Sequence, residues 1–109
     1  MQRIGRVIRL REGTESEYER YHANVWPEIL EAIRKSGIRN HTIFRHGRWL
    51  FSYFELPDNI SLTEAGRIIS SCDVCRKWEK LMHTLQEPLP ESSGDNWWVM
   101  MKEVFHASN

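Results

Sequence analysis

The stretch NHTIFRHGRWLFSYFEL, Asn40 to Leu56, limits the possible architectures of this chain more than any other segment. It holds two runs rich in β-branched and aromatic residues around His46 and Gly47, a pattern that predicts a β-hairpin turning at the glycine. Segments whose apolar residues recur with helical spacing lie before and after it. A central hairpin with helical segments on both sides indicates an α+β fold.

The N-terminal segments predict a strand followed by a helix. Residues 3–10, RIGRVIRL, mix β-branched residues with arginines ahead of a glycine-containing turn, which is typical of a strand with one wet face. Thr14 and Glu17 have the spacing of a capping box, so a helix should begin there. Gly37 should end that helical region with a left-handed cap.

The C-terminal half predicts two further helices and a last strand. Ser61 and Glu64 have the spacing of a second capping box, and Asp73 can cap another helix after a short break. Residues 87–95 are rich in turn formers, which predicts a surface loop before a final strand at 97–105.

The resulting order, β-α-β-β-α-β, is that of the ferredoxin-like fold, an antiparallel sheet with helices on one face. We expect residues 1–109 to form a single domain, because a chain of this length has room for one packed core. The open face of the sheet needs a partner, so a homodimer that buries two such faces is expected. Trp97 and Trp98 should point to opposite faces of the final strand, one toward the core and one toward a partner.

Charge balance and hydropathy argue against several classes of partner. Lysine plus arginine and aspartate plus glutamate each number 15, so no net field attracts nucleic acid or an acidic membrane surface. No apolar run approaches the roughly 18 residues of a membrane span, and the N-terminus lacks the features of a signal peptide. We therefore expect a cytoplasmic protein, in which Cys72 and Cys75 stay unbridged.

Tyr18, His22 and Trp26 are spaced four residues apart, so on a helix they can face the same space. Pro27 lacks a backbone donor, and we expect the helix to kink or restart near Val25 and Trp26. Two interpretations of His22 are open: a partly buried histidine satisfied by a backbone carbonyl, or an acid–base group in a pocket between helix and sheet. A phenol, an imidazole and an indole together suit a small polyhydroxylated ligand such as a sugar.

Other residues with reactive side chains indicate less. Cys72 and Cys75 have CxxC spacing, but no second pair follows, so two small residues near a helix start are a simpler interpretation than a metal or redox site. Strand alternation places His41 and His46 on opposite faces, which argues against joint metal binding, although His41 could line a pocket.

The segments EYERYHANVWPEILEAIRKSGIRNHTIF and SSCDVCRKWEKLM, with the terminal KEVFH, closely resemble the L-rhamnose mutarotase family. The similarity extends over essentially the whole chain, and H-x3-WPE together with DVC-x2-W is its most specific part. The resemblance implies a dimeric α/β barrel of ferredoxin-like protomers, without metal or cofactor. It also implies an enzyme that interconverts the α and β anomers of L-rhamnose.

Carried over residue by residue, the resemblance makes His22 the catalytic proton donor and Tyr18 a substrate-binding residue. Trp78 matches the first of two adjacent tryptophans that line the sugar in the family. Trp26 is a further candidate wall of the sugar site, although its spacing equally suits core packing.

Two positions depart from the family pattern. His41 stands where a tyrosine is common, and Glu79 stands where the second tryptophan follows Trp78. Both side chains could contact sugar hydroxyls. Because these two positions differ from the family pattern, the resemblance supports the reaction class more firmly than the substrate. L-fucose is an alternative 6-deoxyhexose. A haem-binding monooxygenase of the same barrel architecture and a non-catalytic sugar-binding dimer are the rival interpretations.

Overall fold

The computed structural model describes residues 1–108 and contains, within them, one five-stranded sheet. Its strands are β1 (Gln2–Leu10), β2 (Arg39–His46), β3 (Trp49–Leu56), β4 (Gln86–Glu87) and β5 (Val99–Met101). The path through the sheet is β2-β3-β1-β4, and β5 pairs with a different part of β1. All pairings are antiparallel, and β2 and β3 form the predicted hairpin.

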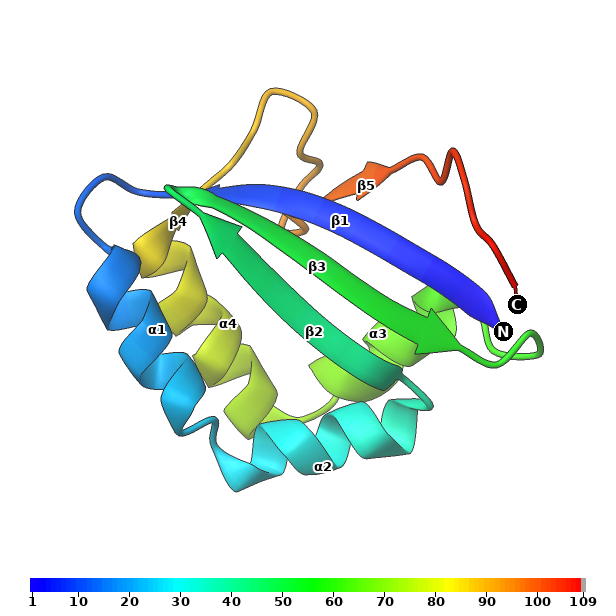
Figure 1. Cartoon of the computed structure of the whole chain (residues 1–109). Helices are drawn as coiled ribbons and strands as arrows, with labels where there is room; N and C mark the ends of the chain where they lie inside the picture. The colour runs from blue at the N-terminus through cyan, green and yellow to red at the C-terminus, as the bar shows by residue number, and fades with distance from the viewer. Residues whose placement is uncertain (109) are drawn as a thin grey trace.

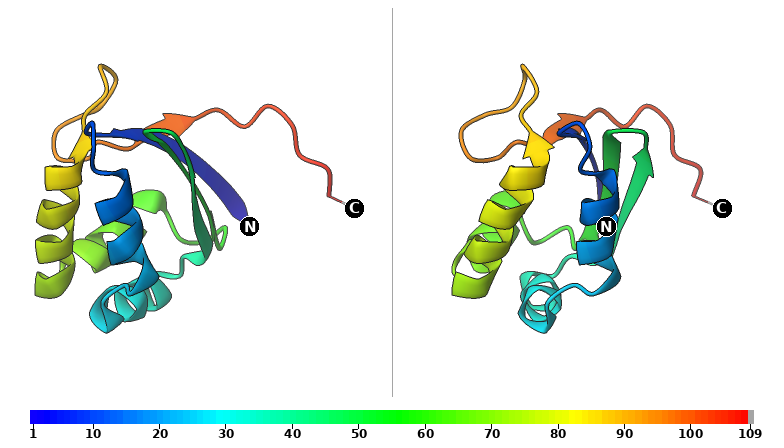
Figure 2. Two further views of the ribbon diagram at one scale, coloured as in Figure 1. Left: turned by 60° about the vertical axis from the view of Figure 1, so that its left-hand side comes forward. Right: turned by 90° about the vertical axis from the view of Figure 1, so that its left-hand side faces the viewer.

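Four helices in the described part of the chain connect the strands and cover one face of the sheet (Figures 1 and 2). They are α1 (Glu15–Ala23), α2 (Pro27–Ser36), α3 (Leu62–Ser70) and α4 (Asp73–Leu85). Each crossover of the ferredoxin-like order thus holds two helices, and the predicted α+β fold class is confirmed. None of the helices in residues 1–108 has the length and apolar character needed to cross a membrane.

Alternation along β1 and β3 turns their even-numbered residues toward the helices. Ile8, Leu10 and Leu50 pack against Tyr18 of α1 and Met82 of α4. Ile4, Phe54 and Leu56 pack against Ala65 of α3, so the apolar core lies between the sheet and the helices. The apolar side chains that line this side of the two strands are Ile4, Ile8, Leu10, Leu50, Phe54 and Leu56. No helix of residues 1–108 lies on the opposite face of the sheet (Figure 2).

The helix is interrupted between α1 and α2, as predicted from Pro27. Helix α1 ends at Ala23, and Pro27 is the first residue of α2, where its missing donor costs no helical hydrogen bond. Gly37 ends α2 with a φ of 89°, as predicted for a left-handed cap. Trp26 therefore lies outside α1, and the expectation of one helical stripe was wrong at its last member.

The two predicted capping boxes have different outcomes. The Thr14 side chain makes no cap bond, and its hydroxyl instead lies within hydrogen-bond distance of the carbonyl oxygens of Arg11 and Leu85, at 2.8 and 2.9 Å. A tertiary contact thus takes the hydroxyl that a local cap would have used. At the start of α3, the Ser61 hydroxyl accepts from the backbone N–H of Glu64 at 3.1 Å, as predicted.

The final strand is shorter than the predicted 97–105, because only Val99–Met101 of this segment pair with β1. Trp97 and Trp98 precede β5 and do not alternate within a strand, so that expectation was wrong. The Trp97 ring stacks on His83 with centroids 3.7 Å apart, and the Trp98 ring lies beside the Arg6 guanidinium. Tertiary contacts of the tryptophans override their β-propensity. After β5 the chain extends away from the helices (Figure 2).

A β-bulge in β2 turns His41 toward the helices. The register with β3 shifts between Arg39 and Thr42, and Asn40 within this interval has a positive φ of 54°. The extra residue in β2 reverses the face of the sheet toward which each following side chain of the strand points. His41 consequently faces the helices while His46 faces the open side, so the predicted placement on opposite faces is confirmed.

Candidate active site

Four rings from three parts of the chain meet between the helices. Tyr18 and His22 in α1 stack with ring centroids 4.1 Å apart. Trp78 of α4 meets His22 edge-on at 5.3 Å and Trp26 edge-on at 5.0 Å. Trp26 reaches this cluster from the segment between α1 and α2. The fold thus brings together four of the six predicted site residues.

The imidazole of His22 is held in one tautomer. Its Nδ1 lies 2.9 Å from the backbone carbonyl oxygen of Tyr18, one helical turn earlier. Because a carbonyl oxygen only accepts hydrogen bonds, Nδ1 carries the hydrogen, and Nε2 of the neutral ring keeps its lone pair. Burial lowers the pKa of His22, and the bond to Tyr18 opposes part of that effect. At neutral pH, Nε2 is therefore mainly a proton acceptor.

Tyr18 remains a hydrogen-bond donor under the same conditions. The residue is buried, with 4% of its surface exposed. Burial raises the pKa of its phenol well above the usual value, and the neighbouring Gln86 side chain opposes part of that rise. A protonated phenol and a neutral imidazole thus lie side by side.

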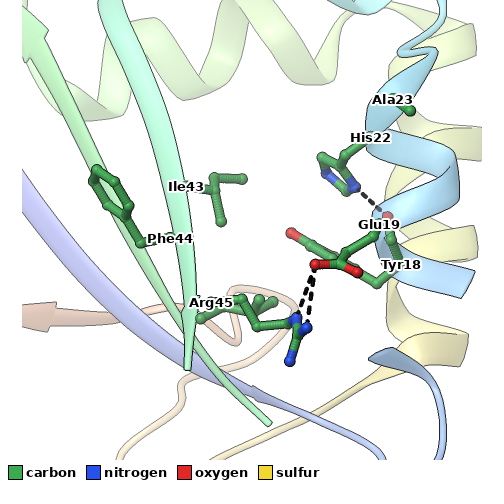
Figure 3. Close-up of a pocket in the computed structure, with 8 residues that line it drawn as sticks. Tyr18, Glu19, His22, Ala23, Ile43, Phe44 and Arg45 are labelled. Atoms are coloured by element: carbon green, nitrogen blue, oxygen red, sulfur yellow. Dashed lines mark hydrogen bonds and ion pairs between the residues drawn. The ribbon is translucent and has the colours of Figure 1, made fainter. Parts of the chain in front are cut away.

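A cavity of about 450 Å³ opens between α1 and the edge strand β2 (Figure 3). Tyr18 and His22 line it from the helix, and Ile43 points into it from the strand. Arg45 of β2 donates two hydrogen bonds of 3.2 Å to the Glu19 carboxylate of α1, which links the two sides. The volume is within the range of about 300–1,000 Å³ found for small-molecule sites.

His41 approaches the same region from the sheet. Its Nε2 lies 3.2 Å from the Ser52 hydroxyl oxygen, and its ring meets Phe54 edge-on at 5.5 Å. Although the residue as a whole is exposed at the sheet edge, its ring is packed against these neighbours. Burial, with smaller effects of the positive Arg6 and of His22, lowers the pKa of His41 to about 4. The ring is therefore neutral at physiological pH.

Glu79 is displaced from the aromatic cluster. Its side chain is 60% exposed, and its carboxylate lies 3.5 Å from Nε2 of His83, one helical turn later. Successive residues of a helix point about 100° apart, so the inward-facing Trp78 leaves Glu79 at the side of α4. The charge of Glu79 still reaches Arg6, where it opposes part of the fall in guanidinium pKa that burial causes.

Arg6 is a charged residue near the site that sequence patterns did not identify. It lies on the helix-facing side of β1, with its guanidinium 5.0 Å from the ring centroid of Phe54 and 5.2 Å from that of Trp98. Burial lowers its pKa to about 10. The signal was an arginine within the apolar alternation of RIGRVIRL, and assigning all these arginines to a wet face missed it.

The CxxC pair serves as a helix start. Cys72, rather than the predicted Asp73, is the N-cap of α4, and its sulfur accepts a hydrogen bond from the backbone N–H of Cys75 at 3.3 Å. Both cysteines are free. Across residues 1–108, no three histidine, cysteine, aspartate or glutamate side chains gather in a way that could hold a metal ion.

Comparisons with known proteins identify the family. The L-rhamnose mutarotase family model matches residues 3–107. The L-rhamnose mutarotases of Lactiplantibacillus plantarum and Listeria monocytogenes are 38% and 32% identical to this chain, each over 97% of this chain and 98% of the relative. The crystal structure of an L-rhamnose mutarotase from Formosa agariphila has the same fold, with a TM-score of 0.77 at 20% identity over 99% of this chain and 100% of that one. This chain therefore belongs to the L-rhamnose mutarotase family.

Proposed function

We propose that this protein interconverts the α and β anomers of a 6-deoxyhexose, with L-rhamnose as the first candidate and L-fucose as the second. This proposal rests mainly on the geometry of His22. Its Nδ1 donates a hydrogen bond to the backbone carbonyl oxygen of Tyr18, and its Nε2 is available for proton transfer beside a cavity of monosaccharide size. The relatives described above are L-rhamnose mutarotases, which supports the same reaction here.

Mutarotation moves one proton off the anomeric hydroxyl and one onto the ring oxygen, so that the ring opens and can reclose on either face of the carbonyl. In the proposed mechanism, Nε2 of His22 accepts the first proton and returns it, as the imidazolium donor, when the ring closes. The Tyr18 phenol is the candidate donor to the ring oxygen, and it recovers its proton on closure. A positioned acid or base contributes about 10²- to 10⁴-fold, enough for a reaction that is already spontaneous.

The remaining predicted residues would bind the sugar. Trp78 and Trp26 present apolar ring surfaces that suit the C–H face or the C6 methyl group of a 6-deoxyhexose. His41 and Glu79 would replace the tyrosine and tryptophan of the family pattern as polar contacts to hydroxyl groups.

Restoring the family residues tests this assignment. The double variant His41→Tyr and Glu79→Trp should raise the ratio of L-rhamnose to L-fucose activity relative to the wild type. The ratio of kcat/KM values for the two sugars is the readout, because it cancels differences in protein concentration. An unchanged ratio would remove His41 and Glu79 from the substrate contacts.

We also propose a cytoplasmic homodimer in which two open sheet faces meet. Phe44, Trp49 and Phe51 lie on this face and are 64%, 38% and 37% exposed. Apolar side chains gathered on one face favour a protein partner. A second copy would cover them and close the two sheets into the dimeric α/β barrel implied by the family resemblance. The free cysteines suit a reducing compartment.

Anomer exchange measured by NMR tests the function directly. Saturation transfer between the anomeric protons of L-rhamnose, and separately of L-fucose, is compared for wild-type protein, His22→Ala and a blank without protein. Acceleration that is lost in His22→Ala supports the proposal and identifies the sugar. Folded wild-type protein that accelerates anomer exchange in neither sugar would refute the proposal. A haem titration would then test the monooxygenase alternative.

A further inference from the structure

Arg6 lies between apolar residues in the row of side chains that β1 turns toward the helices. Its neighbours in this row, Ile4, Ile8 and Leu10, are buried. Because a guanidinium stays protonated at any physiological pH, Arg6 brings a positive charge into the layer between the sheet and the helices.

One buried donor of the Arg6 guanidinium, Nε, lacks an acceptor. The rings of Phe54 and Trp98 lie 5.0 and 5.2 Å from it, which is the distance of cation–π contacts. Its Nε is shielded from solvent and has no hydrogen-bond partner within residues 1–108. Contacts to ring faces do not satisfy the Nε–H group, and a buried polar group without a hydrogen-bond partner is unfavourable. An oxygen-bearing ligand would supply the missing acceptor.

Arg6 also lies beside the groups of the candidate active site. It pairs across the sheet with Ser52, whose hydroxyl contacts Nε2 of His41 at 3.2 Å. The Phe54 ring contacts both Arg6 and His41. Burial is the main cause of the lowered pKa of His41, and Arg6 and His22 lower it further, so both groups lie within electrostatic reach of His41.

We propose that Arg6 is a substrate-binding residue that donates hydrogen bonds from the edge of its guanidinium to oxygen atoms of the sugar bound beside His22. This inference rests on the proposed mutarotase function and deepens it by adding a cation from the sheet to the sugar contacts. The planar fork of a guanidinium matches two neighbouring oxygens. The expected ligand is therefore a sugar that presents two adjacent hydroxyl groups to the sheet.

The first test compares the kinetics of arginine variants. Arg6→Met keeps an unbranched side chain as far as the position of Nε but removes the guanidinium and its donors. Arg6→Lys keeps the charge, and Arg67→Met changes an exposed arginine of α3 as a matched control. With the sugar that the wild type accelerates, Arg6→Met should raise KM about 10-fold or more, since hydrogen bonds to a charged group are lost. Its kcat should stay within about threefold of wild type, Arg6→Lys should be intermediate, and Arg67→Met should match wild type.

Monodeoxy derivatives of the same sugar test for direct contact. Removing a hydroxyl that Arg6 binds should raise KM for the wild type but not for Arg6→Met, because the variant has already lost that interaction. Equal KM penalties in both proteins for every derivative would overturn the proposal. So would an unchanged KM in Arg6→Met accompanied by a lower Tm, which would assign Arg6 to packing against Phe54 and Trp98.

Sugar binding by Arg6 can be tested separately from mutarotase activity. If the wild type accelerates anomer exchange of no sugar, the proposed function fails. The role of Arg6 in sugar binding is then tested by the rise in Tm that L-rhamnose or L-fucose produces on binding. A rise in the wild type and in Arg67→Met that is lost in Arg6→Met would support the sugar contact. An equal rise in all three proteins, or none in the wild type, would overturn it.

Discussion

Burial between the sheet and the helices has the same effect on the pKa of three basic residues. Burial lowers the pKa of His22, His41 and Arg6, because each is a base whose charged form loses hydration there. The two imidazoles are therefore mainly neutral at pH 7, whereas Arg6, with a pKa of about 10, remains a cation. The proposed site thus combines a proton acceptor, neutral hydrogen-bonding groups and one fixed positive charge.

The lowered pKa of His22 predicts the pH dependence of catalysis. Anomer exchange above the blank should stay constant as the pH falls from about 8 to about 6.5, the unperturbed pKa of histidine, and should decline only below it. Exchange rates for wild type and His22→Ala across this range provide the measurement. A decline that begins between about pH 8 and 7 would indicate a different titrating group.

The pKa of His41 predicts how stability depends on pH. Its folded-state pKa of about 4 is below the unfolded value of about 6.5, so the unfolded state binds more protons between these values. Stability should therefore fall as the pH is lowered through this window. His41→Asn should show a smaller fall in urea midpoint between about pH 7 and 4.5. His46→Asn, on the other face of β2, is the control, and equal falls in all three proteins would contradict the assignment.

Among the secondary-structure elements, the two-helix crossover α1–α2 positions the site. Its interruption places Trp26 against Trp78 while α1 presents Tyr18 and His22 to the cavity. Gly37 ends α2 in a left-handed conformation and leads the chain into β2. The end of α2 therefore depends on a backbone conformation that side chains other than glycine disfavour.

A pair of glycine substitutions tests this element. Gly37→Ala should destabilise the protein by about 1–2 kcal/mol or more, because its φ is 89° and the added Cβ would lie 2.6 Å from Cδ1 of Ile60. Gly66→Ala, within α3, should stabilise by up to about 1 kcal/mol, since its Cβ would meet nothing within 4 Å. Urea unfolding measures both. Similar midpoints for the two variants would show that the Gly37 conformation is not under strain.

The molecule as a whole has two unlike faces. Helices cover one side of the sheet (Figure 2). Phe44, Trp49 and Phe51 remain exposed on the other side. The proposed dimer explains why such large apolar side chains lie on an open sheet, because joining two copies would remove them from water.

Oligomeric state tests this proposal. Wild-type protein should elute as a dimer in size-exclusion chromatography with light scattering, and Phe51→Asp should shift it to monomer by placing a charge in the interface. Leu30→Asp, at a 56% exposed leucine of α2, should leave the dimer intact. A monomeric wild type, or a Phe51→Asp protein as dimeric as wild type, would rule out this face as the interface.

Local signals were sufficient to predict most of the fold. The turn at Gly47, the helix restart at Pro27 and the cap at Gly37 each depend on the backbone of one or two residues. The alternation and helical spacing of apolar residues likewise predicted the order of elements from β1 to α4. They did not predict the short strand β4, because Glu87 falls within the predicted surface loop. Family motifs identified Tyr18 and His22 in the same way, because four-residue spacing brings two side chains together within one helix.

Features that depend on distant partners needed the folded chain. Thr14 bonds to Leu85 instead of capping its helix, and the register of β2 against β3 contains the bulge that turns His41 inward. Arg6 belongs to a pattern that suggested a wet strand face, yet the packing of Phe54 and Trp98 encloses it. A local pattern specifies which conformation a segment prefers, whereas burial and hydrogen-bond partners depend on residues that only folding brings together.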